Sequence, residues 1–320
     1  MDPPAESGQA PASDKTTKSF GSRTTSDFGN QTTSTFADRT SVTPLRLPRA
    51  KIVLWGDSLT QTSWEGWGAQ LANRYQRSAD ILNRGMSGYN STWFLQLPDE
   101  KVDNVALCTI WFGANDASLE EHNPHHFVSL EDYQKNLKTL VEKANKLLNK
   151  PNLLLITAPP VAHEQRFAYQ KLRYGDKATG VLERTLENSG KYAKACQEVA
   201  EELELPCLNL WDKFQTVEDW PKFLSDGLHF STEGHDFVFQ CLDEAIAAHY
   251  PSLVVTPCPH TGQACNSGSK CEGLPTFGPY HDKINSKEPD VAMKQAFKDL
   301  DLGGEFAKSP STKKPKMDAP

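Results

Sequence analysis

Short apolar runs alternate with longer stripes of apolar residues through the middle of the chain. Runs of the kind that form buried strands span residues 51–55, 80–83, 105–111, 152–157 and 206–210. Apolar side chains recur at helical spacing across residues 133–148, 181–203 and 238–246. Strands that alternate with amphipathic helices build a parallel sheet that is covered on both faces. The pattern therefore predicts a three-layer α/β/α domain over residues 49–252, with a parallel sheet of roughly five strands.

Two of the predicted helices have recognisable starts. Ser129, with Asp132 three residues later, has the spacing of a capping box ahead of the stripe at 133–148. The first apolar run stops at Gly-Asp-Ser, residues 56–58, and Trp64 and Trp67 indicate a helix beyond it. A sharp turn of this kind places residue 58 at the carboxyl edge of the sheet, where ligands bind in such folds.

The two ends of the chain differ from the middle in composition. Ser and Thr occupy 16 of the first 44 positions, which include one Val and no Leu or Ile. Because such a segment has little apolar surface to bury, we predict that residues 1–48 are disordered. Its regularly spaced Phe residues leave two interpretations, a partner-binding tail and a low-complexity spacer. Residues 253–320, rich in Pro, Gly and polar side chains, are predicted to form a largely irregular extension of unknown function.

The C-terminal extension contains a cluster of metal-ligand side chains, made of Cys258, His260, Cys265 and Cys271. These residues could bind zinc, but their spacings match no standard zinc finger and no paired C-x-x-C is present. Free thiols or a disulfide are the favoured alternatives.

Charge and cysteine usage narrow the class of protein. A net charge of −7 argues against binding of nucleic acid, and no apolar run approaches the length of a membrane span. Single cysteines inside apolar segments are typical of reduced intracellular proteins, and four fit this description: Cys108, Cys196, Cys207 and Cys241. We therefore expect a cytoplasmic protein.

Candidate chemistry follows the predicted strands. Ser58 lies at a strand-to-helix turn, where backbone N–H groups favour a developing anion. The loops after other strands contain Ser-Gly-Tyr-Asn at 87–90, Gly-Ala-Asn-Asp at 113–116 and Asp-Gly-Leu-His at 226–229. Each segment alone could be an ordinary turn. Because the carboxyl ends of parallel strands meet at one edge, the four segments together predict an active site.

In this order, the four segments resemble those of the SGNH, or GDSL, family of serine hydrolases. The resemblance covers residues 51–250 and implies a flavodoxin-like SGNH-hydrolase fold. It implies that Ser58 is the nucleophile, His229 the base and Asp226 the carboxylate that orients the base. The oxyanion hole would consist of the backbone N–H groups of Ser58 and Gly88 and the side-chain amide of Asn115. Nothing in these segments requires a metal or an organic cofactor.

The chemistry of the side chains agrees with these roles. A serine hydroxyl is a poor nucleophile until an imidazole takes its proton. A carboxylate that accepts from the other ring nitrogen fixes the imidazole tautomer, and Asp226, three residues before His229, is close enough to do so. We interpret Asp57, the other carboxylate beside Ser58, as a structural residue that caps the turn.

Within the family, the segments are most similar to the isoamyl acetate-hydrolysing esterases. The similarity extends to Trp-Glu-Gly-Trp at 64–67, to residues 111–117 and to Thr-Ala-Pro-Pro at 157–160, although the family's typical triple proline is reduced to Ala-Pro-Pro. It implies small acetate and short-acyl esters as substrates.

Several side chains near these segments could line an apolar substrate pocket, namely Trp64, Trp67, Met86, Tyr89 and Phe112. Ordinary core packing explains each of them equally well. The segment 161–180 is expected to form a wall of the pocket. We interpret its His163 as a loop residue, since one base is enough for this chemistry.

The sequence therefore predicts a carboxylic ester hydrolase that works through an acyl-serine intermediate on a small-molecule ester. Lysophospholipase, thioesterase and carbohydrate deacetylase activities are the alternatives within the family, because loop changes alter substrates on one fold. An inactive binding module is the alternative from another class, and the complete set of site residues argues against it. The physiological ester, protein partners of the tails and the oligomeric state stay open.

Overall fold

The computed structural model describes residues 49–255, Leu274 and Val291. The predicted disordered tail and the cluster of Cys258, His260, Cys265 and Cys271 lie outside the described residues.

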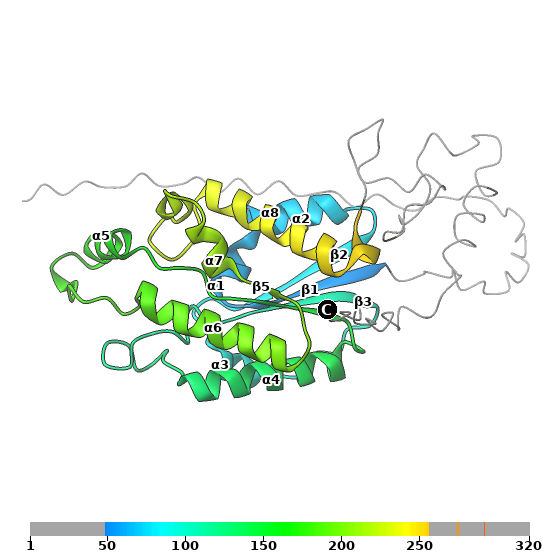
Figure 1. The fold of residues 1–320 in the computed structure, drawn as a ribbon, viewed down its shortest axis with the longest axis horizontal. Coiled ribbons are helices and arrows are strands. Elements are labelled where there is room, and N and C mark those ends of the chain that lie inside the picture. The colour runs from blue at the N-terminus through cyan, green and yellow to red at the C-terminus, as the bar shows by residue number, and fades with distance from the viewer. Residues whose placement is uncertain (1–48, 256–273, 275–290, 292–320) are drawn as a thin grey trace, which may run out of the picture. The chain divides into compact units, whose positions relative to one another are not determined.

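A five-stranded parallel sheet forms the centre of the described part of the chain (Figure 1), and its strand order is β2-β1-β3-β4-β5. The strands are β1 Ala50–Gly56, β2 Ala79–Gly85, β3 Val105–Trp111, β4 Asn152–Ile156 and β5 Cys207–Leu208. All four strand pairs are parallel. This is the flavodoxin-like order, and it confirms the predicted fold class.

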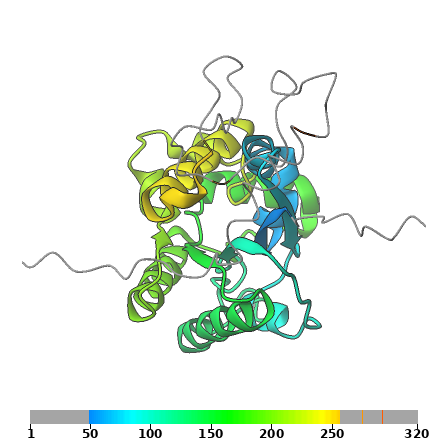
Figure 2. The ribbon, with the colours of Figure 1, turned by 90° about the vertical axis from the view of Figure 1, so that its right-hand side faces the viewer.

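Helices cover both faces of the sheet (Figures 1 and 2). Helices α2 Trp67–Tyr75 and α8 Thr232–His249 cover one face, and α3 Ser91–Leu95, α4 Leu130–Leu147 and α6 Leu186–Glu202 cover the other. The other helical elements are α1 Ser58–Gln61, η1 Thr62–Glu65, α5 His163–Tyr174, η2 Gly175–Lys177, α7 Leu210–Gln215, η3 Trp220–Phe223 and η4 Pro251–Leu253. Within the described residues, no helix is long and apolar enough to cross a membrane.

The alternation of side chains along β1 divides the core into two apolar clusters. Ile52 and Leu54 belong to the cluster under α2 and α8, whereas Val53 and Trp55 belong to the cluster under α4 and α6. Leu274 is also buried in the first cluster.

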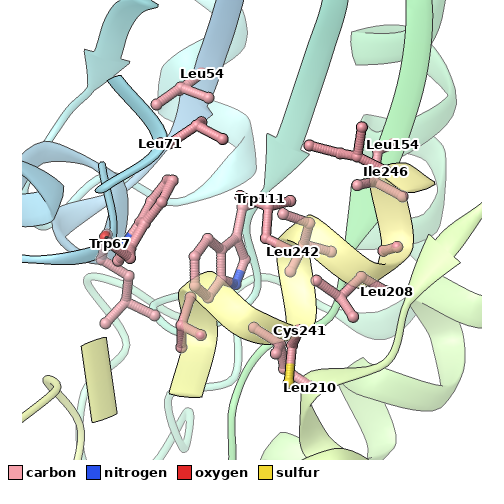
Figure 3. Close-up of a cluster of buried hydrophobic side chains, with 14 of the residues drawn as sticks. Leu54, Trp67, Leu71, Trp111, Leu154, Leu208, Leu210, Cys241, Leu242 and Ile246 are labelled. Carbon is pink, nitrogen blue, oxygen red and sulfur yellow. Dashed lines mark hydrogen bonds between the residues drawn. The ribbon is translucent and has the colours of Figure 1, made fainter. Parts of the chain in front are cut away.

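Two tryptophans lie at the centre of the first cluster (Figure 3). The rings of Trp67 and Trp111 are 5.6 Å apart, and Leu242 and Ile246 of α8 pack in the same cluster. The Trp67 indole N–H donates to the backbone oxygen of Leu59 at 3.0 Å. Because a buried indole N–H needs an acceptor, this bond ties α2 to the short helix that begins with Ser58.

Several element boundaries differ from those predicted. The fifth strand has two residues, since Asn209 caps α7 by accepting from the Asp212 N–H at 3.0 Å. The helix predicted from residue 181 begins at Leu186, after its cap Thr185. The helix expected beyond Ser58 is divided at Gly66 into η1 and α2. Helix α4, in contrast, starts at the predicted place, where Ser129 Oγ accepts from the Asp132 N–H at 3.2 Å.

Candidate active site

Ser58 lies at the carboxyl end of β1, between β2 and β3 in the sheet. Strand β1 ends at Gly56 and α1 begins at Ser58, with Asp57 as its cap. The Asp57 carboxylate accepts from the backbone N–H of Leu59 at 2.9 Å. The chain therefore turns sharply from strand to helix at the serine, which is only 6% exposed.

His229 joins Ser58 to Asp226. Its Nε2 atom lies 2.9 Å from the Ser58 hydroxyl oxygen, and its Nδ1 atom lies 2.9 Å from Oδ2 of Asp226. The serine and the histidine are 171 positions apart in the chain, so the fold alone brings them together. The three side chains predicted as nucleophile, base and orienting carboxylate thus form one hydrogen-bonded series.

The loop that carries Asp226 and His229 is braced by its own carboxylate. Asp226 Oδ1 accepts from the backbone N–H groups of Leu228 at 2.9 Å and His229 at 2.7 Å. Gly227 has φ +82°, and a β-carbon there would lie 2.5 Å from the backbone oxygen of Ala162. The loop therefore packs so closely on the start of α5 that only glycine fits.

Asp226 is held in its charged form. Burial works against ionisation, but the hydrogen bond and charge of His229 and the guanidinium of Arg166 outweigh it and hold the pKa of Asp226 well below its usual range. Arg166 Nη1 lies 3.0 Å from Asp226 Oδ2, the oxygen that also faces the imidazole. A permanent carboxylate is what an imidazole that becomes a cation requires.

Asn115 joins the loops that follow β2 and β3. Its Nδ2 donates to the backbone oxygen of Tyr89 at 2.9 Å, and its Oδ1 accepts from Arg184 Nη2 at 2.9 Å. Gly88, with φ +80°, is next to Tyr89. The first of these loops is also fixed beside the serine turn, because the Met86 N–H donates to the oxygen of Gly56 at 2.9 Å. The predicted oxyanion donors therefore lie in adjoining loops at one edge of the sheet.

Two fully buried carboxyl groups support these loops. Asp116 Oδ2 accepts from the Gly113 N–H at 3.1 Å and Asp116 Oδ1 accepts from the Ser91 N–H at 2.9 Å, which fastens the loop after β3 to α3. Burial raises the pKa of Asp116 to about 6 and that of Asp57 to about 7. The hydrogen bond that the Leu59 N–H donates to Asp57 fits the interpretation of Asp57 as a structural cap.

The predicted pocket residues divide into accessible and buried ones. Trp64 is 46% exposed, and Met86 and Tyr89 are partly buried. Phe112 and Trp67 are 0% exposed, which favours core packing, the other interpretation of these two residues. Phe112 packs against the ring of Phe94 at 4.8 Å in the core under α4 and α6.

The segment 161–180 forms α5 and η2 (Figure 1). His163 Nε2 accepts from the backbone N–H of Leu186 at 2.8 Å, which ties the start of α5 to the start of α6. Phe167, Leu172 and Tyr174 are exposed. A groove of about 450 Å³ lies elsewhere, between α6 and α7 beside Trp211, and none of the predicted site residues lines it.

Sequence reasoning missed the supporting charges of the site. Glu183 and Arg184 fall inside the apolar pattern that precedes α6, and nothing in their spacing distinguishes them from solvent-exposed residues. Arg166 lies in the segment 161–180, which the sequence predicts to form a wall of the pocket. That position was the one sign in the sequence that Arg166 could contact the site.

Known proteins resemble this chain across the whole site. Residues 54–237 match the model of the GDSL-like lipase/acylhydrolase family. A GDSL esterase/lipase of Arabidopsis thaliana is 37% identical over 256 residues, which cover 77% of this chain and 98% of the relative. The isoamyl acetate-hydrolyzing esterase 1 homolog of Bos taurus is 40% identical over 223 residues, 67% of this chain and 87% of the relative. A solved structure of a lipase/acylhydrolase from Enterococcus faecalis aligns at 24% identity and a TM-score of 0.47, over 62% of this chain and 96% of that one.

Proposed function

This chain belongs to the GDSL-like lipase/acylhydrolase family and hydrolyses ester bonds, and we propose that it cleaves small or short-acyl esters, such as acetate esters, through an acyl-Ser58 intermediate. The observation that carries the proposal is the series from Ser58 through His229 to Asp226, with 2.9 Å at each step. These are the distances at which a base can take the proton of a nucleophile.

In the first half of the reaction, the Ser58 hydroxyl oxygen attacks the ester carbonyl carbon while His229 Nε2 takes its proton. Asp226 keeps the other proton of the ring on Nδ1 and stabilises the imidazolium. The tetrahedral intermediate then collapses, the carbon–oxygen bond to the alcohol breaks, and His229 returns the proton to the leaving alcohol. In the second half, water attacks the acyl-serine in the same way and releases the carboxylic acid.

The negative charge of each intermediate falls on the former carbonyl oxygen. Under the proposal, the backbone N–H groups of Ser58 and Gly88 and the Asn115 amide donate to it. One N–H of Asn115 Nδ2 bonds to Tyr89, which leaves the second for the oxyanion. Donors of this kind need no proton transfer and act as soon as the charge develops.

The substrate class is supported by a relative that is 40% identical and is named for hydrolysis of isoamyl acetate. We extend that preference to this chain. Exposed Trp64 and the partly buried Met86 and Tyr89 are the side chains that we propose for contact with the ester. Lysophospholipase, thioesterase and carbohydrate deacetylase activities are the other outcomes of the test.

The test compares substrates on one enzyme. Purified protein and its Ser58→Ala variant are assayed with p-nitrophenyl acetate, butyrate, octanoate and palmitate, with isoamyl acetate, and with a lysophospholipid, an acyl thioester and an acetylated sugar. We expect the highest kcat/KM on acetate and butyrate esters and no turnover by Ser58→Ala. A maximum on palmitate, lysophospholipid, thioester or acetylated sugar contradicts the substrate class, and equal turnover by the two proteins contradicts the nucleophile.

We also propose that the protein works in the cytoplasm. Cys108, Cys196, Cys207 and Cys241 carry free thiols in the described part of the chain, as expected in a reducing compartment. Fractionation of cells that express the tagged full chain tests this, and recovery from an oxidising compartment or from the medium contradicts it.

A further inference from the structure

Three charged side chains outside the proposed catalytic set connect Asn115 to Asp226. They are Arg166 of α5 and Glu183 and Arg184, which precede α6. Arg184 bonds Asn115, Glu183 bonds both arginines, and Arg166 bonds Asp226. The series joins the amide of the proposed oxyanion hole to the carboxylate of the proposed triad.

Each of the three guanidinium nitrogens of Arg184 makes a contact within this network. Nε donates to the backbone oxygen of Ala114 at 2.8 Å, Nη2 donates to Asn115 Oδ1 at 2.9 Å, and Nη1 lies 3.2 Å from Glu183 Oε1. The side chain is buried, with the residue 6% exposed. A planar guanidinium that bonds a backbone oxygen and its neighbouring side chain fixes the angle between them.

The contact also determines which way the Asn115 amide faces. A guanidinium has donors only, so it selects the oxygen end of an amide. With Oδ1 held by Arg184, Nδ2 must face the other way, where it donates to the backbone oxygen of Tyr89. A reversed amide would place an oxygen lone pair where the developing oxyanion needs a donor.

Glu183 makes the burial of two arginines tolerable. Its Oε1 accepts from Arg166 Nε at 2.8 Å and from Arg184 Nη1 at 3.2 Å, and Gln170 donates to its other oxygen. Burial opposes its ionisation, but the charge of Arg166 first and that of Arg184 as well hold the pKa of Glu183 below its usual value. Two arginines and two carboxylates balance in charge, which a buried network requires.

We propose that Arg184 is a positioning residue that orients the Asn115 amide toward the oxyanion, and that Glu183 and Arg166 tie it to Asp226. The inference rests on the proposed function. Its consequence is that the oxyanion donor and the carboxylate that orients the base share one largely buried support, made of Arg166 in α5 and Glu183 and Arg184 just before α6.

A double-mutant cycle tests whether Arg184 acts through Asn115. The cycle compares kcat and KM for p-nitrophenyl acetate in the wild type, Asn115→Ala, Arg184→Gln and the double variant. We expect Asn115→Ala to lower kcat by about 10²–10³ and Arg184→Gln by at least about tenfold, each with KM within about threefold. The double variant should be no slower than Asn115→Ala, since the amide that Arg184 orients is already absent. Multiplied effects, as two independent defects would give, overturn the inference.

Two further variants keep the test decisive if Arg184→Gln does not fold. Arg184→Lys keeps the charge but cannot bond Ala114 and Asn115 in one plane, so its kcat should stay at least about fivefold below wild type. Full activity of Arg184→Lys contradicts the positioning role. Arg74→Gln, which removes a partly exposed arginine of α2 that is paired with Asp243 of α8, is the control and should keep the wild-type kcat.

The wild type separates failure of the inference from failure of the proposed function. If the wild type neither turns over esters nor reacts with a fluorophosphonate, the proposed function fails. If it does both, and Asn115→Ala is slow while Arg184→Gln keeps wild-type kcat, only the positioning role fails. Wild-type kcat in Asn115→Ala removes Asn115 from the oxyanion hole and overturns the inference with it.

Discussion

Asp226 holds His229 at two points. One carboxylate oxygen accepts from the His229 backbone N–H at 2.7 Å, and the other lies 2.9 Å from the Nδ1 atom of the ring. A single buried side chain therefore sets both the path of the loop and the tautomer of the imidazole. Gly227, which lies between Asp226 and His229 with φ +82°, lets the chain turn back within three residues so that both contacts can form.

Asp226→Asn should remove the tautomer control while it preserves the loop. The amide oxygen can still accept from the backbone N–H groups, but an NH₂ group would face Nδ1 and favour the wrong tautomer. We expect kcat for p-nitrophenyl acetate to fall by about 10⁴, with KM near the wild-type value. Circular dichroism and thermal unfolding check the fold, and a kcat within tenfold of wild type would show that Asp226 does not orient the base.

Asn115→Ala should impair turnover far more than stability. Loss of an oxyanion donor typically costs about 10²–10³ in kcat, whereas an amide hydrogen bond contributes only about 1 kcal/mol to folding. Asn152→Ala is the matched control, because Asn152 Nδ2 also bonds a backbone oxygen, that of Ala106 at 2.7 Å, but at the start of β4. The control should lose comparable stability and keep its kcat. Equal kcat in Asn115→Ala and Asn152→Ala would contradict the role of Asn115 as an oxyanion donor.

Gly227→Ala should lower both stability and activity. A β-carbon there would lie 2.5 Å from the Ala162 oxygen and 2.6 Å from the Arg166 nitrogen, in a backbone conformation that side chains disfavour. We expect the free energy of unfolding to fall by about 2–4 kcal/mol, measured with urea. Gly180→Ala is the control, since Gly180 also has positive φ, at +69°, but a β-carbon there would meet no other atom within 4 Å, and it should lose about 1 kcal/mol. Similar losses in both variants would mean that the His229 loop is not closely packed on α5.

The buried carboxyl group of Asp57 should make stability depend on pH. Burial raises the pKa of Asp57 to about 7, so the folded protein retains a proton that the unfolded chain releases near pH 4. The free energy of unfolding should therefore fall as pH rises from about 4 to about 7, and Asp116, with its pKa raised to about 6, adds to the fall. The lowered pKa values of Asp226 and Glu183 act in the opposite sense and at lower pH.

Urea unfolding at several pH values from about 4.5 to about 7.5 measures how steeply the free energy of unfolding changes with pH. Asp57→Asn should flatten this slope by up to about 1.4 kcal/mol per pH unit. Asp80→Asn, which removes a half-exposed carboxylate paired with Arg49, serves as the control and should retain the wild-type slope. A slope in Asp57→Asn equal to that of the wild type contradicts the buried, protonated Asp57.

The sequence was sufficient for the sheet and for the candidate nucleophile, base and carboxylate. A strand that is apolar on both faces, such as β3, must be buried in a sheet that is covered on both sides. In a parallel sheet, the loops that follow the strands all lie at the carboxyl edge. The two-residue β5 was not foreseeable, because the cap at Asn209 and the start of α7 override a run that has strand character. The local sequence pattern determines where a strand or helix ends only if no capping or tertiary contact favours a different boundary.

The network of Arg166, Glu183 and Arg184 could not be predicted from the spacing of apolar and polar residues in the sequence. Arg184 follows Glu183 just before a helix, as an exposed charge would, and its burial depends on contacts with Glu183, Ala114 and Asn115 that the sequence does not reveal. Pattern also could not decide between pocket lining and core packing for Phe112, which is buried in the core. It follows a strand and precedes the Gly113 loop, so the face on which it packs depends on the register of the sheet rather than on its neighbours in sequence.

Ser58 as a nucleophile activated by His229 is tested most directly by covalent labelling with a fluorophosphonate probe, with the labelled peptide identified by mass spectrometry. The wild type should carry the label on Ser58, and His229→Ala should slow labelling by about 10³ or more. His249→Ala, which changes an exposed histidine at the end of α8, should label at the wild-type rate. A label on another residue, or Ser58 labelled at an undiminished rate in His229→Ala, would contradict the mechanism.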